Sequence, residues 1–141
     1  MVYRYNKMNL QEHIRRILME ETNKILYSAV VLDNESRYKL LTKLEEFTPS
    51  DWRVIAHHMT IKFGEGVDEV GEEVDLTVTH IGINDMVVAV KVKGYPSSNK
   101  IPHVTLAVNP DGGKPVMSNN IQQWEEIKPF KISGQVKNIF K

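Results

Sequence analysis

Residues 58–61 (HMTI) and 103–106 (HVTL) are two short segments with the same pattern, in which a histidine and a threonine alternate with apolar residues. Successive side chains of a β-strand point to opposite faces, so residues i and i+2 lie on the same side. Within each segment the histidine therefore lies beside the threonine, while the apolar residues face the other way. We expect two strands that each pack one face and present an imidazole and a hydroxyl on the other.

The composition indicates one domain with no sulfur chemistry. A chain of 141 residues can form a single core, and residues 1–141 are expected to form one domain. The absence of cysteine excludes disulfides, thiolate metal sites and a cysteine nucleophile, and it is typical of a cytoplasmic protein. No signal sequence or apolar run long enough to cross a membrane is seen.

The charge balance limits the class of ligand. Eighteen basic residues offset eighteen acidic ones, so the chain lacks the positive field with which proteins hold long nucleic acids. A small anionic substrate is compatible with this balance. The sequence leaves the oligomeric state open.

Hydrophobic periodicity and turn residues predict an α+β fold with antiparallel hairpins. The expected elements are a helix over about 10–24, a strand over 27–32, a helix from 34 to 47, a strand over 54–63, a hairpin of 74–83 with 86–93 around Asn84 and Asp85, a strand over 102–108, a weaker helix over 115–124 and one or two strands within 130–140. The acidic stretch 68–75 is expected to be a loop.

The alternation of strand side chains between two faces places His58 and its neighbour His57 on opposite sides of the expected strand. His57 shares its expected face with Met59, Ile61 and Phe63, so we predict that it is a partly buried structural histidine. His80 is expected to be structural and His13 to lie at the surface of the first helix. No third ligand with catalytic zinc spacing accompanies the histidine pair, so neither a metal nor another cofactor is expected.

The two elements resemble the paired His-x-Thr/Ser motifs of the 2H phosphoesterase superfamily, and the resemblance covers most of the chain, from residue 27 to residue 124. The resemblance implies two lobes of antiparallel sheet flanking a central cleft, with helices outside, and a metal-independent phosphodiesterase. The phrases that carry a finer resemblance are 27–33 (YSAVVLD), 56–61 (AHHMTI), 102–108 (PHVTLAV) and 113–119 (GKPVMSN). They are similar to the phage anti-CBASS nucleases, which destroy the cyclic oligonucleotide messengers of a bacterial immune system.

This resemblance makes His58, Thr60, His103 and Thr105 the candidate catalytic residues. One histidine would act as a base and the other as an acid, because an imidazole exists in both protonation states near neutral pH. The threonines would donate hydrogen bonds to nonbridging phosphate oxygens. The sequence does not decide which histidine is the base.

Three further residues are candidate substrate contacts. Tyr27 and Trp124 could stack on a nucleobase, and Lys114, after two glycines, could reach a phosphate. For each residue the residue type alone favours the other role, core packing for the two aromatic residues and an exposed loop position for the lysine. We expect hydrolysis of the 3′–5′ linkages of a cyclic di- or trinucleotide, such as cyclic GMP-AMP. The expected location is the cytoplasm, which is that of the host if the protein is encoded by a phage. A 2′,3′-cyclic phosphodiesterase acting on RNA ends and a non-catalytic cyclic-nucleotide sponge are the alternatives.

Overall fold

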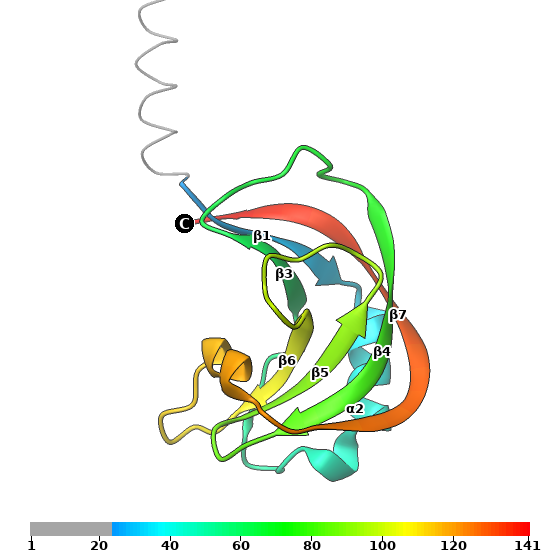
Figure 1. Ribbon diagram of the computed structural model, residues 1–141, viewed down its shortest axis with the longest axis vertical. Coiled ribbons are helices and arrows are strands. Elements are labelled where there is room, and N and C mark those ends of the chain that lie inside the picture. The colour runs from blue at the N-terminus through cyan, green and yellow to red at the C-terminus, as the bar shows by residue number, and fades with distance from the viewer. Residues whose placement is uncertain (1–23) are drawn as a thin grey trace, which may run out of the picture.

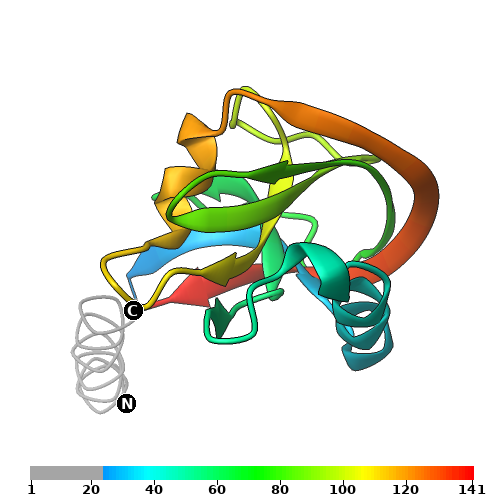
Figure 2. The same ribbon diagram turned by 90° about the horizontal axis from the view of Figure 1, so that it is seen from below.

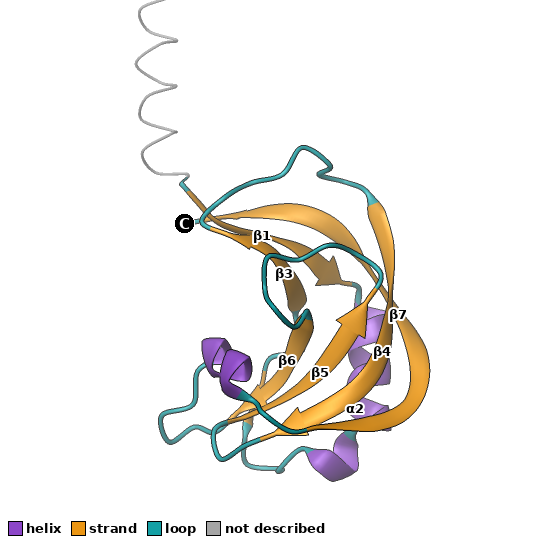
Figure 3. Ribbon diagram, viewed as in Figure 1, coloured by secondary structure: helices purple, strands orange, loops and turns teal. Residues whose placement is uncertain are grey.

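The computed structural model describes residues 24–141, and the helix expected over residues 10–24, with His13, lies outside them apart from Lys24. Seven strands form one antiparallel sheet in the order β2-β6-β3-β1-β7-β4-β5, and β5 also pairs with β6 (Figures 1 and 3). The elements are β1 (Ile25–Leu32), α2 (Asn34–Lys43), the 3-10 helix η1 (Glu45–Phe47), β2 (Arg53–Val54), β3 (His58–Phe63), β4 (Glu73–Ile83), β5 (Val87–Lys93), β6 (His103–Val108), the 3-10 helix η2 (Pro115–Asn120) and β7 (Trp124–Phe140).

The pairing of β5 with β6 closes six strands into a barrel, and the short β2 pairs with the end of β6 on the same edge as β3. Closure gives the strands partners on both sides, which removes exposed sheet edges. The interior is filled by one face of each strand, with Met59, Leu76, Val90 and Val104 all fully buried. Each such aliphatic side chain stabilises the fold by about 1.5–3 kcal/mol on burial.

Two short helical elements lie outside the barrel, on different sides of it (Figures 1 and 2). Helix α2 packs Leu40 and Leu44 against the main core, and the Asp33 side chain caps its first turn by accepting from the Ser36 backbone N–H (2.7 Å). On another side η2 precedes Ile121, which packs with Val87 of β5 in a separate small cluster. None of the helices within residues 24–141 is long and apolar enough to cross a membrane.

The outer face of β5 and β6 is therefore covered near η2, which explains why β6 is buried along its whole length. Alternate residues of β5 belong to different cores: Val88 and Val90 face the barrel interior, whereas Val87 and Ala89 lie in the small cluster beside η2. This arrangement gives the two faces of the β5–β6 pair different roles. One face fills the barrel and the other forms the floor of an external site.

The closed barrel corrects the predicted architecture. The sequence resemblance implied two lobes flanking a central cleft, but the β5–β6 pairing joins the strands into a single barrel, so the two-lobed prediction is wrong. The antiparallel sheet, the few external helices and the hairpin around Asn84 are confirmed. In that hairpin the Asn84 side chain accepts from the backbone N–H groups of Met86 and Val87.

Several element boundaries differ from the prediction for local reasons. The strand expected over 54–63 is interrupted, because Ala56 adopts a positive φ of 41° between β2 and β3. The helix expected over 115–124 is the shorter η2, which ends before β7 begins at Trp124. The strand or strands expected within 130–140 are the end of a single 17-residue strand, β7, which curves around the barrel (Figure 1).

Candidate active site

All four predicted catalytic residues line one external cavity of about 410 Å³. His58 and Thr60 come from β3, and His103 and Thr105 come from β6. Their strand neighbours Met59 and Val104 point into the barrel core, so the alternation predicted from the sequence separates the polar pairs from the packed face. The structure thus brings together two segments that lie far apart in the chain.

The strand register explains how the two pairs meet. Strands β3 and β6 run antiparallel, with Met59 directly opposite Val104. Extending this register by one residue to either side places His58 across from Thr105 and Thr60 across from His103. Directly opposed side chains on one face have Cβ atoms about 4.5–5.5 Å apart. Each histidine therefore has the threonine of the other strand as a neighbour, in addition to the threonine of its own strand.

His58 lies in a packed and electrostatically unfavourable setting for a positive charge. Its ring stacks on Tyr27, with centroids 4.8 Å apart and planes at 23°, and its Nδ1 lies 2.9 Å from Nδ1 of His57. Burial is the main cause that lowers the pKa of His58 to about 4, followed by the charges of His57 and His103. Both histidines line the same cavity, so a positive charge on His103 disfavours one on His58.

His103 is fixed by its own backbone. Its Nδ1 lies 2.8 Å from the carbonyl oxygen of Ile101, which can only accept, so Nδ1 carries the hydrogen and donates it. Burial lowers the pKa of His103, and the hydrogen bond to the Ile101 carbonyl acts in the opposite direction. The Nε2 atom is then the ring nitrogen that remains for a substrate.

His57 is partly buried and hydrogen-bonded, as predicted, but it does not lie on the packed face with Met59. Because β3 begins only at His58, the alternation that would place His57 beside Met59 does not extend to it, and its half-buried ring meets His58 edge-on at a centroid distance of 5.1 Å. The pKa of His57 is lowered by burial and then by the positive charges of Arg37 and Lys137. His57 is therefore a neighbour of His58, whereas the sequence pattern predicted a structural histidine on the packed face.

Arg37 of α2 holds the turn that precedes the two histidines. Its guanidinium donates to the carbonyl oxygens of Ala56 (2.8 Å) and Ile55 (3.2 Å). The N–H of Ala56 donates in turn to the Thr105 carbonyl of β6 (2.9 Å). A positive φ is unfavourable for alanine, and these bonds from both sides fix it there. Arg37 thus links α2 to the start of the His58 strand.

The two threonines differ in the freedom of their hydroxyl groups. Thr105 Oγ1 lies 2.7 Å from Ser118 Oγ and donates to the Pro115 carbonyl at 3.3 Å, so η2 already engages it. Thr60 binds Ser97 Oγ through its backbone carbonyl (2.7 Å), and its hydroxyl has no protein partner within residues 24–141. Thr60 is therefore the threonine whose hydroxyl is free to donate to a bound phosphoryl oxygen.

Of the predicted substrate contacts, only Tyr27 lines the cavity, where its ring supports His58. Lys114 is exposed just before η2 and does not line the cavity. Trp124 also lies outside it: the ring packs beside the small cluster that contains Ile121, and Lys91 Nζ lies 6.0 Å from its centroid. His80 does not line the cavity either, and its Nδ1 lies 2.8 Å from Thr79 Oγ1.

Several other cavity residues were not singled out from the sequence. Phe63 was expected on the packed face with Met59, yet it is 83% exposed at the end of β3, and Val116 of η2 is 66% exposed. Their apolar side chains lie at the cavity with the amides of Asn99 and Asn119. The one feature of the sequence that could have indicated an exposed Phe63 is its position at the end of a strand, directly before Gly64.

The arrangement combines two titratable rings, a free hydroxyl and exposed apolar groups around one hollow, which are the parts needed for acid–base chemistry on an anionic, ring-bearing substrate. Within residues 24–141, no group of three histidine, aspartate or glutamate side chains is placed to hold a metal ion. The residues lining the cavity offer imidazole, hydroxyl and amide groups but no carboxylate.

Comparison with known proteins agrees with this chemistry. No curated protein matches the chain by sequence. Residues 46–139, which include both His/Thr pairs, match the model of the fungal tRNA ligase phosphodiesterase domain, a family of 2H phosphoesterases. The match supports a phosphodiesterase of the superfamily to which the motifs pointed, and it carries no information on the anti-CBASS branch. The chain belongs to the fungal tRNA ligase phosphodiesterase domain family, within the 2H phosphoesterases.

Proposed function

We propose that this protein hydrolyses the 2′,3′-cyclic phosphate at the end of a short RNA, using His58 and His103 as a base and acid pair. The observation that carries the proposal is that both His/Thr pairs line one cavity. The family of the chain, named for the phosphodiesterase domain of fungal tRNA ligase, supports the same activity. The zero net charge favours a short ribonucleotide end over a long duplex. Such a substrate would be met in the cytoplasm.

His58 is the base in this mechanism. A low pKa keeps its ring neutral near pH 7, and a base must begin unprotonated. If His58 donates its Nδ1 hydrogen to Nδ1 of His57, its Nε2 is free to take a proton from an attacking water. Burial, and then the positive charges of Arg37 and Lys137, lower the pKa of His57, and a neutral His57 ring can accept this hydrogen when its own hydrogen lies on Nε2. With that pairing, His57 holds His58 in the tautomer that the reaction needs.

His103 is the acid. The Ile101 carbonyl accepts from Nδ1 and stabilises the protonated ring, which opposes the effect of burial. As the water oxygen bonds to phosphorus, the bond from phosphorus to one of the two ribose oxygens breaks, and Nε2–H of His103 protonates that oxygen. The product is a phosphomonoester with a free ribose hydroxyl. Each of the two proton transfers typically accelerates a reaction about 10²–10⁴-fold.

The free hydroxyl of Thr60 stabilises the phosphorane-like transition state by donating to a nonbridging oxygen, as preorganised donors do in other acyl and phosphoryl transfers. Thr105 takes this role only after its hydroxyl turns away from Pro115 and Ser118, so its first function is to fix η2 over the site. Phe63 offers an exposed aromatic face on which the terminal base stacks.

A second candidate is cleavage of the 3′–5′ linkage in a cyclic di- or trinucleotide messenger, which would counteract CBASS signalling. The sequence phrases similar to the anti-CBASS nucleases support it, and so does the presence of two exposed apolar side chains, Phe63 and Val116, where a single terminal base needs one. The ribose 2′-hydroxyl would then lose its proton to the base and attack the neighbouring phosphorus. The bond from phosphorus to the 5′ oxygen would break, and the acid would protonate that oxygen, which leaves a 2′,3′-cyclic phosphate and a 5′-hydroxyl.

One panel separates these activities. Purified protein is incubated in EDTA with a 2′,3′-cyclic mononucleotide, a trinucleotide ending in a 2′,3′-cyclic phosphate, cyclic dinucleotides and a cyclic trinucleotide, and the products are identified by mass. We expect the 2′,3′-cyclic substrates to gain one water. Cleavage of the cyclic oligonucleotides alone would replace the proposal by the second candidate. Tight binding without any product would identify a sponge, although a binder has no need of paired proton-transfer groups.

A further inference from the structure

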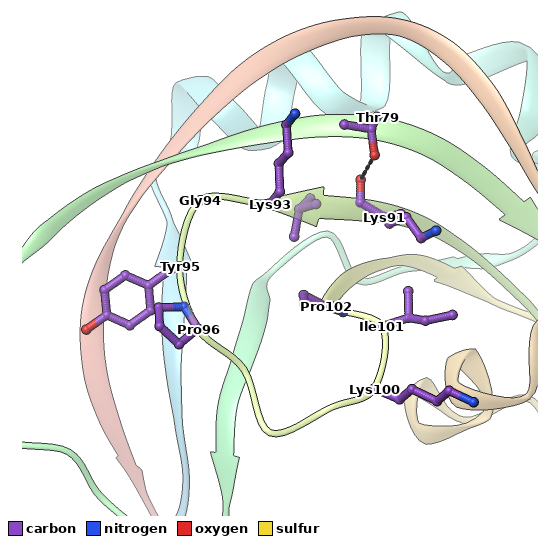
Figure 4. Close-up of a pocket in the computed structure, with 10 residues that line it drawn as sticks. Thr79, Lys91, Lys93, Gly94, Tyr95, Pro96, Lys100, Ile101 and Pro102 are labelled. Carbon is purple, nitrogen blue, oxygen red and sulfur yellow. Dashed lines mark hydrogen bonds between the residues drawn. The ribbon is translucent and has the colours of Figure 1, made fainter.

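A second hollow, of about 490 Å³, lies where β5 meets the loop that leads into β6 (Figure 4). Lys91, Lys93 and Lys100 line it, together with apolar side chains such as Ile101. No carboxylate lines it in the part of the chain that the structure describes. Because the whole chain has a formal net charge of zero, three ammonium groups around one hollow are a local concentration of positive charge.

This second hollow adjoins the catalytic cavity. Lys91 is the direct partner of His103 in the β5–β6 ladder, so the two side chains leave the same face of the sheet as neighbours. The loop before β6 also separates the two hollows: Asn99 lines the catalytic cavity, whereas Lys100 lines the second one. A nucleotide chain whose reacting phosphate lies at His103 therefore passes close to Lys91 and Lys100.

The positive charge is concentrated at one end of the hollow. In Figure 4 the side chains of Lys91 and Lys100 extend to the same side, with Ile101 drawn between them, and Lys93 points away from both. Tyr95 stands at the opposite end, where burial and then the charges of Glu72 and Glu69 raise its pKa. An anion is therefore attracted to the Lys91 and Lys100 end and repelled from the Tyr95 end.

We propose that Lys91 and Lys100 form a second phosphate subsite, which holds the phosphodiester next to the one that reacts. This inference rests on the proposed function and names a further determinant of its substrate. A lysine ammonium is a mobile point charge that suits a phosphate, and the apolar surface of Ile101 suits the sugar or base between the two phosphates. The second phosphate has two sources, the 5′ side of an RNA end or the far linkage of a cyclic dinucleotide.

The test compares a substrate that has only the reacting phosphate with one that also has neighbouring phosphodiesters. The kcat/KM of a trinucleotide ending in a 2′,3′-cyclic phosphate is divided by that of a 2′,3′-cyclic mononucleotide. We expect the double variant Lys91→Ala, Lys100→Ala to lower this ratio about tenfold at low ionic strength, from two exposed ion pairs. When the last linkage of the trinucleotide is an uncharged methylphosphonate, the kcat/KM ratio of the wild type should fall by the same factor. The double variant should show no further fall with this substrate.

The matched control is Lys128→Ala, Lys131→Ala, which removes the same charge from exposed positions of β7 outside both hollows. An equal fall of the ratio in this control, or an unchanged ratio in the Lys91 and Lys100 variant, would overturn the subsite. A parallel measurement with a cyclic dinucleotide distinguishes the source of the second phosphate. If the wild type turns over no 2′,3′-cyclic substrate, the proposed function fails. The subsite is then tested separately by the Kd of a fluorescent trinucleotide, and equal Kd values for the wild type and the double variant would reject the subsite.

Discussion

The Nδ1 atoms of His57 and His58 lie 2.9 Å apart, so two neighbouring imidazoles share one hydrogen. Only one of the two nitrogens can carry it, and that choice decides whether Nε2 of His58 is free to act as a base. His57 thus positions a proton without reaching the substrate itself.

Replacement of His57 tests this role. An asparagine in its place would keep an acceptor close to the position of Nδ1, whereas a phenylalanine would not, so we expect His57→Asn to retain most of kcat/KM and His57→Phe to lose about tenfold to a hundredfold. Nitrogen chemical shifts of the His58 ring should show the Nδ1–H tautomer in the wild type and His57→Asn, and its loss in His57→Phe. His80→Asn, at a histidine that does not line the cavity, is the control. Equal activity of the two His57 variants would contradict the role.

The pH dependence of kcat/KM should be bell-shaped with an acidic optimum. The base His58 must be unprotonated, so the rate rises as pH increases through its pKa of about 4. The acid His103 must be protonated, so the rate falls as pH increases through a pKa that burial lowers from its ordinary value of 6.5. A bound anionic substrate raises both pKa values, and the profile of kcat should therefore lie at higher pH. A kcat/KM optimum above pH 7 would contradict these assignments.

The two threonines should respond differently to removal of the hydroxyl. Thr60→Val leaves a similar shape without the donor, and we expect a fall in kcat of about 10²-fold with little change in Tm, because that hydroxyl has no protein partner within the described residues. Thr105→Val should lower both kcat and Tm, because Ser118 and the Pro115 carbonyl lose the Thr105 hydroxyl as a hydrogen-bond partner. Thermal unfolding and single-turnover rates separate the two effects. A larger fall in Tm for Thr60→Val than for Thr105→Val would contradict this distinction.

Phe63 should act on substrate binding more than on chemistry. We expect Phe63→Ala to raise KM about tenfold, from the loss of one stacked base, and Phe63→Trp to retain the wild-type value. Tyr38→Ala removes a comparably exposed aromatic ring, 73% exposed on α2, and should leave KM unchanged. If KM for Phe63→Ala equals that of the wild type, the terminal base binds elsewhere.

The sequence predicted the parts of the site that depend on local geometry. Alternation within each strand was enough to place His58 with Thr60 and His103 with Thr105, and to separate them from Met59 on the packed face. The hairpin at Asn84 was equally readable, because its turn residues and flanking apolar alternation lie close together in the chain.

Features of the fold and of the site that depend on contacts between distant segments could not be predicted from local sequence patterns. The barrel is closed by β5 pairing with β6, and nothing in either strand alone distinguishes this closure from two separate lobes. The position of His57 follows from the positive φ of Ala56, which the Arg37 side chain fixes from another element. Phe63 and Val116 look like core residues in sequence and are exposed only because β3 ends and η2 turns at those points.

The central claim, that His58 and His103 act together on one phosphorus atom, is tested most directly by the turnover of a 2′,3′-cyclic mononucleotide in EDTA by His58→Ala, His103→Ala and the double variant. Each single variant should lose about 10²–10⁴-fold in kcat while keeping a cooperative unfolding transition, and the double variant should be little slower than the slower single one, because the two groups act in the same step. A wild-type rate in either single variant would contradict the account.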